Sequence, residues 1–282
     1  MYTYIYICDT IVINKRKDSM SKGIDDYDTD WFVDIDNQFD TVSTTQNKMS
    51  KWKPIHLKTA NTNKNADVTF MGDSVLDCRA YTGTQKGTVD YLVEQAPTNY
   101  VEMNKKRVND ITVDGFTIYD CINSVDDVYG NAVVISAGGN DLLSKLSLLK
   151  ATNDNNITMG IMNAELDKLT KAYQTLLYQL KKGGRKFLLI TCYEGNLAYN
   201  PTRFHNVDNV AISIVSMWND RLYRLANQLN NSKNKVGQQF DVLDTRTFMT
   251  PDCFYNEIEP NEIGAKRIAK NINKWLYSNG VW

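Results

Sequence analysis

The sequence has few of the residue types on which metal sites and disulfide frameworks depend. Its 282 residues include only two histidines, His56 and His205, which makes a metal site built on several imidazoles improbable. The five cysteines are odd in number and widely spaced, without a C-x-x-C pair. This usage argues against a disulfide framework or a zinc site and favours a reducing compartment.

The chain also lacks a strong net charge and any long hydrophobic run. A formal charge of -1 gives no overall field that would attract nucleic acid or an anionic membrane. The apolar residues 1–14 are too few to span a bilayer, and the basic run Lys15–Lys17 follows them, the wrong order for a secretory signal. We therefore expect a cytoplasmic or otherwise intracellular protein with no membrane span and no nucleic-acid partner. Either Met1 or Met20 can be the true start.

Residues 18–65 are rich in Asp, Thr, Ser, Asn and Lys and carry few apolar clusters. The aspartates at 25, 26, 28 and 30 suggest calcium, but the segment lacks the Gly and the terminal Glu of an EF-hand loop, so we interpret it as a solvated acidic stretch. The sequence thus predicts a partly disordered N-terminal extension over residues 1–65 and one domain over residues 66–282.

From Asp67 onward, short apolar runs alternate with longer segments of helical periodicity. The expected strands are Val68–Met71, either Tyr100–Met103 or Ile111–Val113, Ala132–Ser136, Phe187–Ile190 and Phe240–Leu243. The expected helices are one through Tyr91–Val93 that ends near Pro97, then Ile118–Val128, Met162–Leu180, Val207–Leu229 and Asn261–Tyr277. This alternation predicts an α/β domain with a central parallel sheet of about five strands, covered on both faces.

Several polar or glycine residues directly follow these strands and should meet at the carboxyl edge of the sheet. Ser74 is expected between a strand and a helix, where its N–H faces the crevice, although a serine there can also be only an N-cap. Asp77 would then lie on the surface of that helix. Asn140, after Gly138 and Gly139, offers a neutral donor for an oxyanion, or simply belongs to a turn before a helix.

Taken together, these blocks resemble the SGNH/GDSL hydrolase family from about Asp67 to the C-terminus. The resemblance is carried by Val68–Asp77, Val113–Thr117, Val134–Leu142 and Tyr255–Ala269. It implies a flavodoxin-like three-layer α/β/α sandwich. It also implies Ser74 as nucleophile and an oxyanion hole formed by the N–H groups of Ser74 and Gly115 with the Asn140 side chain. The implied substrate is a small-molecule or acylated ester, and no metal or organic cofactor is expected.

The last block departs from the usual Asp-x-x-His of this family. Asn256 stands in place of the orienting Asp and Glu259 in place of the catalytic His. A carboxylate is a weaker base than imidazole, but burial near Ile258 and Pro260 would raise its pKa and offset part of this difference. The Asn256 amide is expected to hydrogen-bond the Glu259 carboxylate as a neutral partner. His205, after the segment Tyr193–Arg203, is the alternative base.

The favoured interpretation is a serine esterase or deacylase that forms an acyl-serine at Ser74, with Glu259 as proton acceptor. The alternative is a catalytically inactive protein that keeps the fold for binding or for a structural role. A flavodoxin-like nucleotide binder is a third interpretation, but the chain has no Gly-rich phosphate cradle and no Lys after Ser74. The sequence leaves the substrate and the oligomeric state open.

Overall fold

Five short apolar strands form one parallel sheet in the computed structural model. The structure describes residues 62–96, 105, 107–149, 155–181, 184–195, 208–232 and 237–282. The strands are β1 (Val68–Gly72), β2 (Val108–Thr112), β3 (Ala132–Ser136), β4 (Lys186–Ile190) and β5 (Gln239–Leu243). Their order in the sheet is β2-β1-β3-β4-β5, and every neighbouring pair is parallel. This is the strand order of flavodoxin-like sheets.

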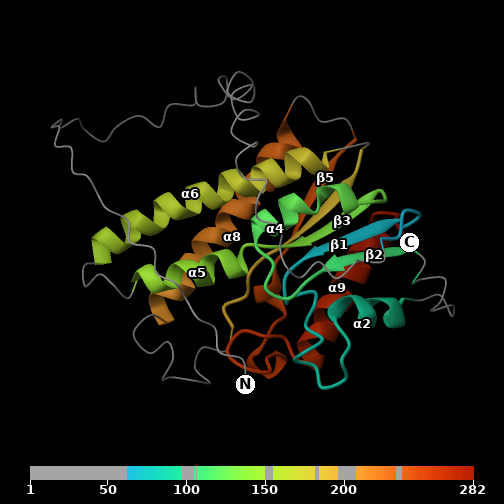
Figure 1. The fold of residues 1–282 in the computed structure, drawn as a ribbon, viewed down its shortest axis with the longest axis horizontal. Coiled ribbons are helices and arrows are strands. Elements are labelled where there is room, and N and C mark those ends of the chain that lie inside the picture. Colours follow the sequence, from blue (N-terminus) through green and yellow to red (C-terminus); the bar gives the residue numbers. More distant parts are fainter. Residues whose placement is uncertain are drawn as a thin grey trace. The chain divides into compact units, whose positions relative to one another are not determined.

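Helices cover both faces of this sheet (Figure 1). One face carries α4 (Ile118–Asn123), α5 (Gly139–Leu149), α6 (Asn155–Leu180) and α8 (Asp208–Asn231). The other face carries α2 (Thr88–Gln95) and α9 (Glu262–Ser278), which pack against each other. The predicted α/β fold with a parallel five-stranded sheet between two helical layers is therefore confirmed.

The side chains of each strand belong to two separate hydrophobic cores, because successive side chains of a strand point to opposite faces of the sheet. In β1, Met71 joins the core with α4, α6 and α8, while Phe70 joins the core with α2 and α9. In β3, Ile135 and Val134 divide in the same way, and all five residues of β3 are buried. A strand that is buried on both faces needs a continuous apolar run, which is what Ala132–Ser136 supplies.

Three details differ from the sequence-based expectation. The second strand ends at Thr112, close to the Ile111–Val113 alternative, while Tyr100–Met103 lies outside the described residues. The helix expected over Ile118–Val128 stops at Asn123, where the Ser124 hydroxyl donates to the Asp120 carbonyl and a short 3-10 helix follows. A helix was expected only after a turn that contains Asn140, whereas α5 already begins at Gly139.

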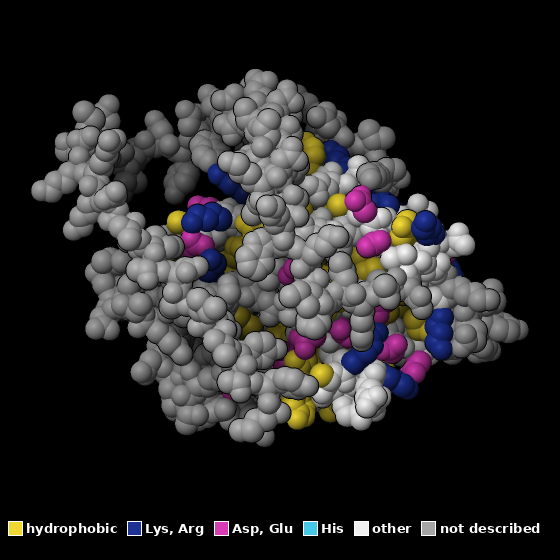
Figure 2. Space-filling model, viewed as in Figure 1, with side chains coloured by type: hydrophobic (Ala, Val, Ile, Leu, Met, Phe, Trp, Pro, Cys, Tyr) yellow, Lys and Arg dark blue, Asp and Glu magenta, His cyan; other side chains and the backbone are white. Residues whose placement is uncertain are grey.

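The predicted N-terminal extension, residues 1–65, lies almost wholly outside the described residues, so its boundary stays a prediction. The acidic segment around residue 28 lies outside them as well. In the part of the chain that is described, no helix is long and apolar enough to cross a membrane. On the face drawn in Figure 2, the acidic and basic side chains of the described residues are interspersed, without a broad area of one sign.

Candidate active site

Ser74 lies in a tight turn at the carboxyl end of β1. Gly72 makes this turn possible: its φ is +131°, and a Cβ at this position would lie 1.7 Å from the Ser136 carbonyl oxygen. The close approach lets the Asp73 N–H donate to that same carbonyl at 3.0 Å. Only glycine tolerates both this backbone angle and this contact.

No helix begins at Ser74, contrary to expectation. The N–H groups of Leu76 and Asp77 both donate to the Asp73 carbonyl at 3.0 Å, which makes one turn, and the helix that follows, α2, starts only at Thr88. Ser74 is therefore neither a helix N-cap nor placed at a helix dipole, and Asp77 is not a residue of a helix surface. The Ser74 side chain is largely buried, and its N–H has no hydrogen-bond partner among the described residues.

The loop with Gly115 lies next to this turn. The Val113 N–H donates to the Gly72 carbonyl at 2.9 Å, which ties the loop to the end of β1. Gly115 has a φ of +88°, a left-handed conformation that glycine adopts without strain. Its N–H, like that of Ser74, has no hydrogen-bond partner among the described residues. Neighbouring loops thus supply two backbone donors for which the described part of the chain holds no acceptor.

Asn140 lies in the first turn of α5 and is fixed to the Gly115 loop. Its Nδ2 donates to the Phe116 carbonyl at 3.0 Å, and the Ile118 N–H donates to Asp141 Oδ2 at 2.9 Å. An amide nitrogen carries two hydrogens, so the second hydrogen of Asn140 stays available for another acceptor. Ser74 and Asn140 line the same pocket.

Glu259 lines this pocket from the last loop before α9. Burial raises the pKa of its carboxyl from an ordinary 4.5 to about 7; the neighbouring Ser74 side chain opposes this rise, and the charges of Asp114 and Asp73 add to it. The Oε2 atom is buried and has no hydrogen-bond partner among the described residues. The carboxyl is therefore poised to hold or release a proton near neutral pH, beside the serine hydroxyl.

The expected role of Asn256 is wrong. Its side-chain oxygen accepts from the N–H groups of Ile258 at 2.9 Å and Glu259 at 2.8 Å, and no hydrogen bond joins its amide to the Glu259 carboxylate. An Asn side chain that bonds backbone groups two and three residues ahead stabilises a turn. Asn256 thus shapes the backbone that carries Glu259 and leaves the carboxyl without the predicted partner.

Asp73 is a second carboxyl of the site that the sequence analysis overlooked. Burial raises its pKa to about 7, although Oδ1 accepts from the Ser136 hydroxyl at 2.6 Å and from the Val75 N–H at 3.2 Å. It lines the pocket between Ser74 and Gly139. A G-D-S motif alone gives no sign of this, because the burial of Asp73 depends on β3, which is distant in sequence.

The pocket beside Ser74 is mostly apolar and has a volume of about 100 Å³. Its apolar walls come from α5, α8 and the loop before Glu259, and consist mainly of Leu142, Leu143, Ala211, Ile214, Val215 and Ile258. The helical spacing of the residues in α8 was recognised in the sequence. That these residues would face the serine was not, because it depends on how α5 and α8 cross.

The alternative base His205 and the second histidine, His56, lie outside the described residues. Tyr193 and Asp244 also follow strands, as expected, but only Tyr193 lines the pocket. Within the described ranges, no group of three or more His, Cys, Asp or Glu side chains is arranged to hold a metal ion.

Comparisons with known proteins agree at the level of fold. No protein-family model matches the chain, and no curated protein matches its sequence. Among solved structures, an acetyl xylan esterase named AlAXEase is similar over 74% of this chain and 97% of its own, with a TM-score of 0.50 and 19% identity. A lipase from a goat rumen metagenome, Lip_vut3, is similar over 74% of this chain and 96% of its own, with a TM-score of 0.52 and 17% identity.

A GDSL-like lipase from Bacteroides thetaiotaomicron is 13% identical and has a TM-score of 0.46, too low to add weight. At such identities the likeness establishes the fold and not the reaction. The resemblance seen in the sequence is confirmed to this extent.

Proposed function

We propose that this chain, which has the fold of the SGNH/GDSL hydrolases, is a serine hydrolase that cleaves an ester through an acyl intermediate on Ser74. The observation that carries the proposal is the pairing of Ser74 and Glu259. Both side chains line one pocket, the Ser74 side chain lowers the pKa of the Glu259 carboxyl, and burial still brings that pKa to about 7. A base acts best when its pKa is close to the working pH.

In the proposed reaction, Glu259 takes the proton of the Ser74 hydroxyl as Oγ attacks the ester carbonyl carbon. The carbonyl oxygen becomes an oxyanion that accepts from the free N–H groups of Ser74 and Gly115 and from the second hydrogen of Asn140 Nδ2. When the carbon–oxygen bond to the alcohol breaks, the departing alkoxide takes the proton held by Glu259, and the acyl group stays on Ser74.

Water then completes the cycle. Glu259, ionised again, takes a proton from a water molecule whose oxygen attacks the acyl carbon. The same three donors hold the second oxyanion, and Ser74 recovers its proton from Glu259 as the acid leaves. Asn256 acts only through the backbone, because its bonds to the Ile258 and Glu259 N–H groups hold the loop from which the carboxyl projects.

The apolar pocket supports a coarse assignment of the substrate. Its volume of about 100 Å³ and its apolar walls fit an acyl group of a few carbons better than a charged or strongly polar acid. A series of p-nitrophenyl esters from acetate to octanoate tests this directly. We expect kcat/KM to fall between butyrate and octanoate; an optimum at octanoate would contradict the assignment.

Labelling with a fluorophosphonate tests the nucleophile. We expect the intact mass of the protein to increase by one adduct, and the Ser74→Ala variant to remain unlabelled. Ser124→Ala is the matched control, since Ser124 is also largely buried but bonds the Asp120 carbonyl at the end of α4. Absence of labelling at every pH, or labelling that persists in Ser74→Ala, would overturn the proposed function in favour of a non-catalytic role.

A further inference from the structure

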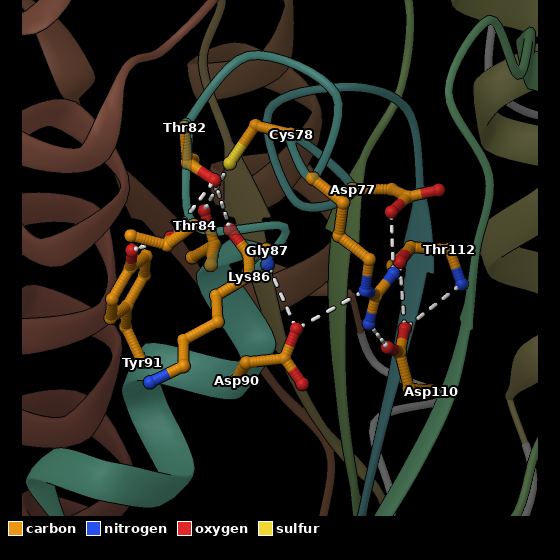
Figure 3. Close-up of polar contacts among 12 residues, drawn as sticks. Asp77, Cys78, Thr82, Thr84, Lys86, Gly87, Asp90, Tyr91, Asp110 and Thr112 are labelled. Carbon is orange, nitrogen blue, oxygen red and sulfur yellow. Dashed lines mark hydrogen bonds and ion pairs between the residues drawn. The ribbon is translucent and has the colours of Figure 1, made fainter.

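One arginine, on the loop that follows Ser74, forms a cluster outside the pocket with three aspartates from that loop, from α2 and from β2. The Arg79 guanidinium contacts all three carboxylates: Nη1 meets Asp77 Oδ1, Nε lies 3.1 Å from Asp90 Oδ2, and Nη2 lies 2.7 Å from Asp110 Oδ2. Figure 3 shows the three aspartates converging from different directions. The arginine side chain is about one-third exposed, so the cluster lies at the protein surface.

Each aspartate of this cluster also holds a different piece of backbone. Asp90 accepts from the Gly87 N–H at 2.8 Å, at the start of α2. Asp110 Oδ1 accepts from the Thr112 N–H at 3.1 Å, at the end of β2. Through its planar fork of donors, Arg79 therefore joins the serine loop to two neighbouring elements, a geometry that lysine cannot reproduce.

The third aspartate connects the cluster to the active site. Asp77 Oδ2 accepts from the Asp114 N–H at 3.2 Å, and Asp114 directly precedes Gly115. The Asp114 side chain is held in turn by the Tyr81 hydroxyl, at 2.7 Å. The loop with the second backbone donor of the site is thus bonded to the serine loop at both the main chain and the side chain of Asp114.

Packing alone does not fix Gly115. A Cβ built on this residue would meet no atom within 4 Å, so no neighbouring atom packs against the Cα of Gly115 on that side. A glycine backbone can also adopt many other φ and ψ angles. The direction of its N–H therefore depends on the hydrogen bonds of its neighbours. The bond from Asp114 to Asp77 is one of them, and Asp77 is held in place by Arg79.

We propose that Arg79 is a positioning residue that aims the Gly115 N–H at the developing oxyanion through Asp77 and Asp114. The proposal rests on the proposed function, since it takes Gly115 as an oxyanion donor. Without the guanidinium, the three carboxylates would repel one another, and Asp77 would move away from the Asp114 N–H. A donor displaced by about 1 Å costs on the order of 100-fold in rate.

The test compares Arg79→Ala with Arg107→Ala. Arg107 is equally exposed and is also paired with an aspartate, Asp67, but it directly precedes β2, at the amino end of the sheet and away from the site. We expect Arg79→Ala to lower kcat about 100-fold with KM changed less than about 3-fold, and Arg79→Lys to recover only part of the loss. Arg107→Ala should keep the wild-type kcat.

A double-mutant cycle separates positioning from general damage. Asp77→Leu removes the acceptor for Asp114 while Arg79 keeps two of its partners. Because both residues act through the same bond, we expect Asp77→Leu to lower kcat as Arg79→Ala does, and the double variant to be no worse than either single one. Losses that multiply, or that fall on KM and kcat alike, would overturn the proposal.

Amide hydrogen exchange over residues 113–117, followed by mass spectrometry, gives a readout that needs no activity. Exchange should be faster in Arg79→Ala and Asp77→Leu than in wild type, and unchanged in Arg107→Ala. If the wild type neither hydrolyses esters nor is labelled, the proposed function fails. Amide hydrogen exchange then still decides whether Arg79 holds the loop that contains Gly115. Wild-type exchange rates in Arg79→Ala would contradict the role of Arg79 under either outcome.

Discussion

The two sides of the proposed active site are built in opposite ways. On the oxyanion side, hydrogen bonds tie three loops together: Asp73 to Ser136, Asp77 to Asp114, and Asn140 to the Phe116 carbonyl. On the base side, Glu259 Oε2 is buried and has no hydrogen-bond partner among the described residues, and the Asn256 side-chain oxygen accepts from two backbone N–H groups. One side is held by many polar contacts, while the carboxyl of the other side has few in the described part of the chain.

This difference follows from what each side has to do. Donors that stabilise an oxyanion must already point at it, and a network of hydrogen bonds supplies such fixed orientation. A base must instead change its charge during the reaction, and a carboxylate with several strong donors would have a low pKa and bind protons weakly. Burial raises the pKa of Glu259, which under the proposed mechanism lets a glutamate act as the base.

The largest expected effect comes from removing the base. Glu259→Gln keeps the size of the side chain but cannot take a proton, so we expect kcat to fall about 10³- to 10⁴-fold. Steady-state kinetics with p-nitrophenyl acetate measures the change. Glu262→Gln, an exposed residue of α9 that pairs with Lys266, is the control and should behave as wild type. A loss of less than 10-fold in Glu259→Gln would remove Glu259 from the mechanism.

The next effect tests the oxyanion side. Asn140→Ala removes a side-chain donor and should lower kcat about 10²- to 10³-fold, with little change in KM, because the oxyanion exists only in the transition state. Asn271→Ala, which removes an amide that bonds the Arg267 carbonyl within α9, should leave both constants unchanged. An increase in KM with unaltered kcat would mean that Asn140 binds the substrate instead.

A third prediction concerns the free energy of unfolding, which the buried Glu259 carboxyl should lower at alkaline pH. Because burial raises the pKa of Glu259 from 4.5 to about 7, the folded state keeps a proton that the unfolded chain has released between these values. Stability from this group is therefore present at pH 4 and lost as the pH rises through 7. Glu259→Gln should be more stable than wild type by up to about 3 kcal/mol at pH 8 and equal to it at pH 4. Urea unfolding at the two pH values measures both differences; equal stability at pH 8 would contradict the burial of a charge.

The smallest effect should follow Asn256→Asp, which restores the residue type usual at this position. Aspartate also accepts from the Ile258 and Glu259 N–H groups, so the turn should persist. Its negative charge near Glu259 should raise the pKa of that carboxyl and move the pH–rate midpoint upward by about half a unit. The plateau rate should stay within about 3-fold of wild type; a strong gain in rate would instead restore a catalytic role to position 256.

The sheet and the polar residues that gather at its edge were largely predictable from the sequence. Ala132–Ser136 is apolar throughout, so only a strand buried on both faces fits it, and its bounds were predicted correctly. The polar residues that follow such strands then had to share one edge, which placed Ser74, Gly115 and Asn140 in neighbouring loops.

Two predictions about the site were wrong, and in both places hydrogen bonds between residues close in sequence replace the expected structure. A helix after Ser74 was expected from strand–helix alternation, but the chain makes a single turn before it continues to α2. The Asn256 amide was expected to donate to the Glu259 carboxylate because the two groups are chemically complementary. Its side-chain oxygen instead accepts from backbone N–H groups two and three residues ahead. Local competition of this kind is typical of Asn and cannot be read from residue type alone.

The rate of Ser74 phosphonylation as a function of pH tests the central claim most directly, because it measures the proton transfer from Ser74 without product release. The account predicts a single ionisation with a midpoint near 7, as expected from the pKa of Glu259, and its loss in Glu259→Gln. The same midpoint should persist in His205→Ala. A midpoint that survives Glu259→Gln and disappears in His205→Ala would contradict the account and assign the base to the histidine.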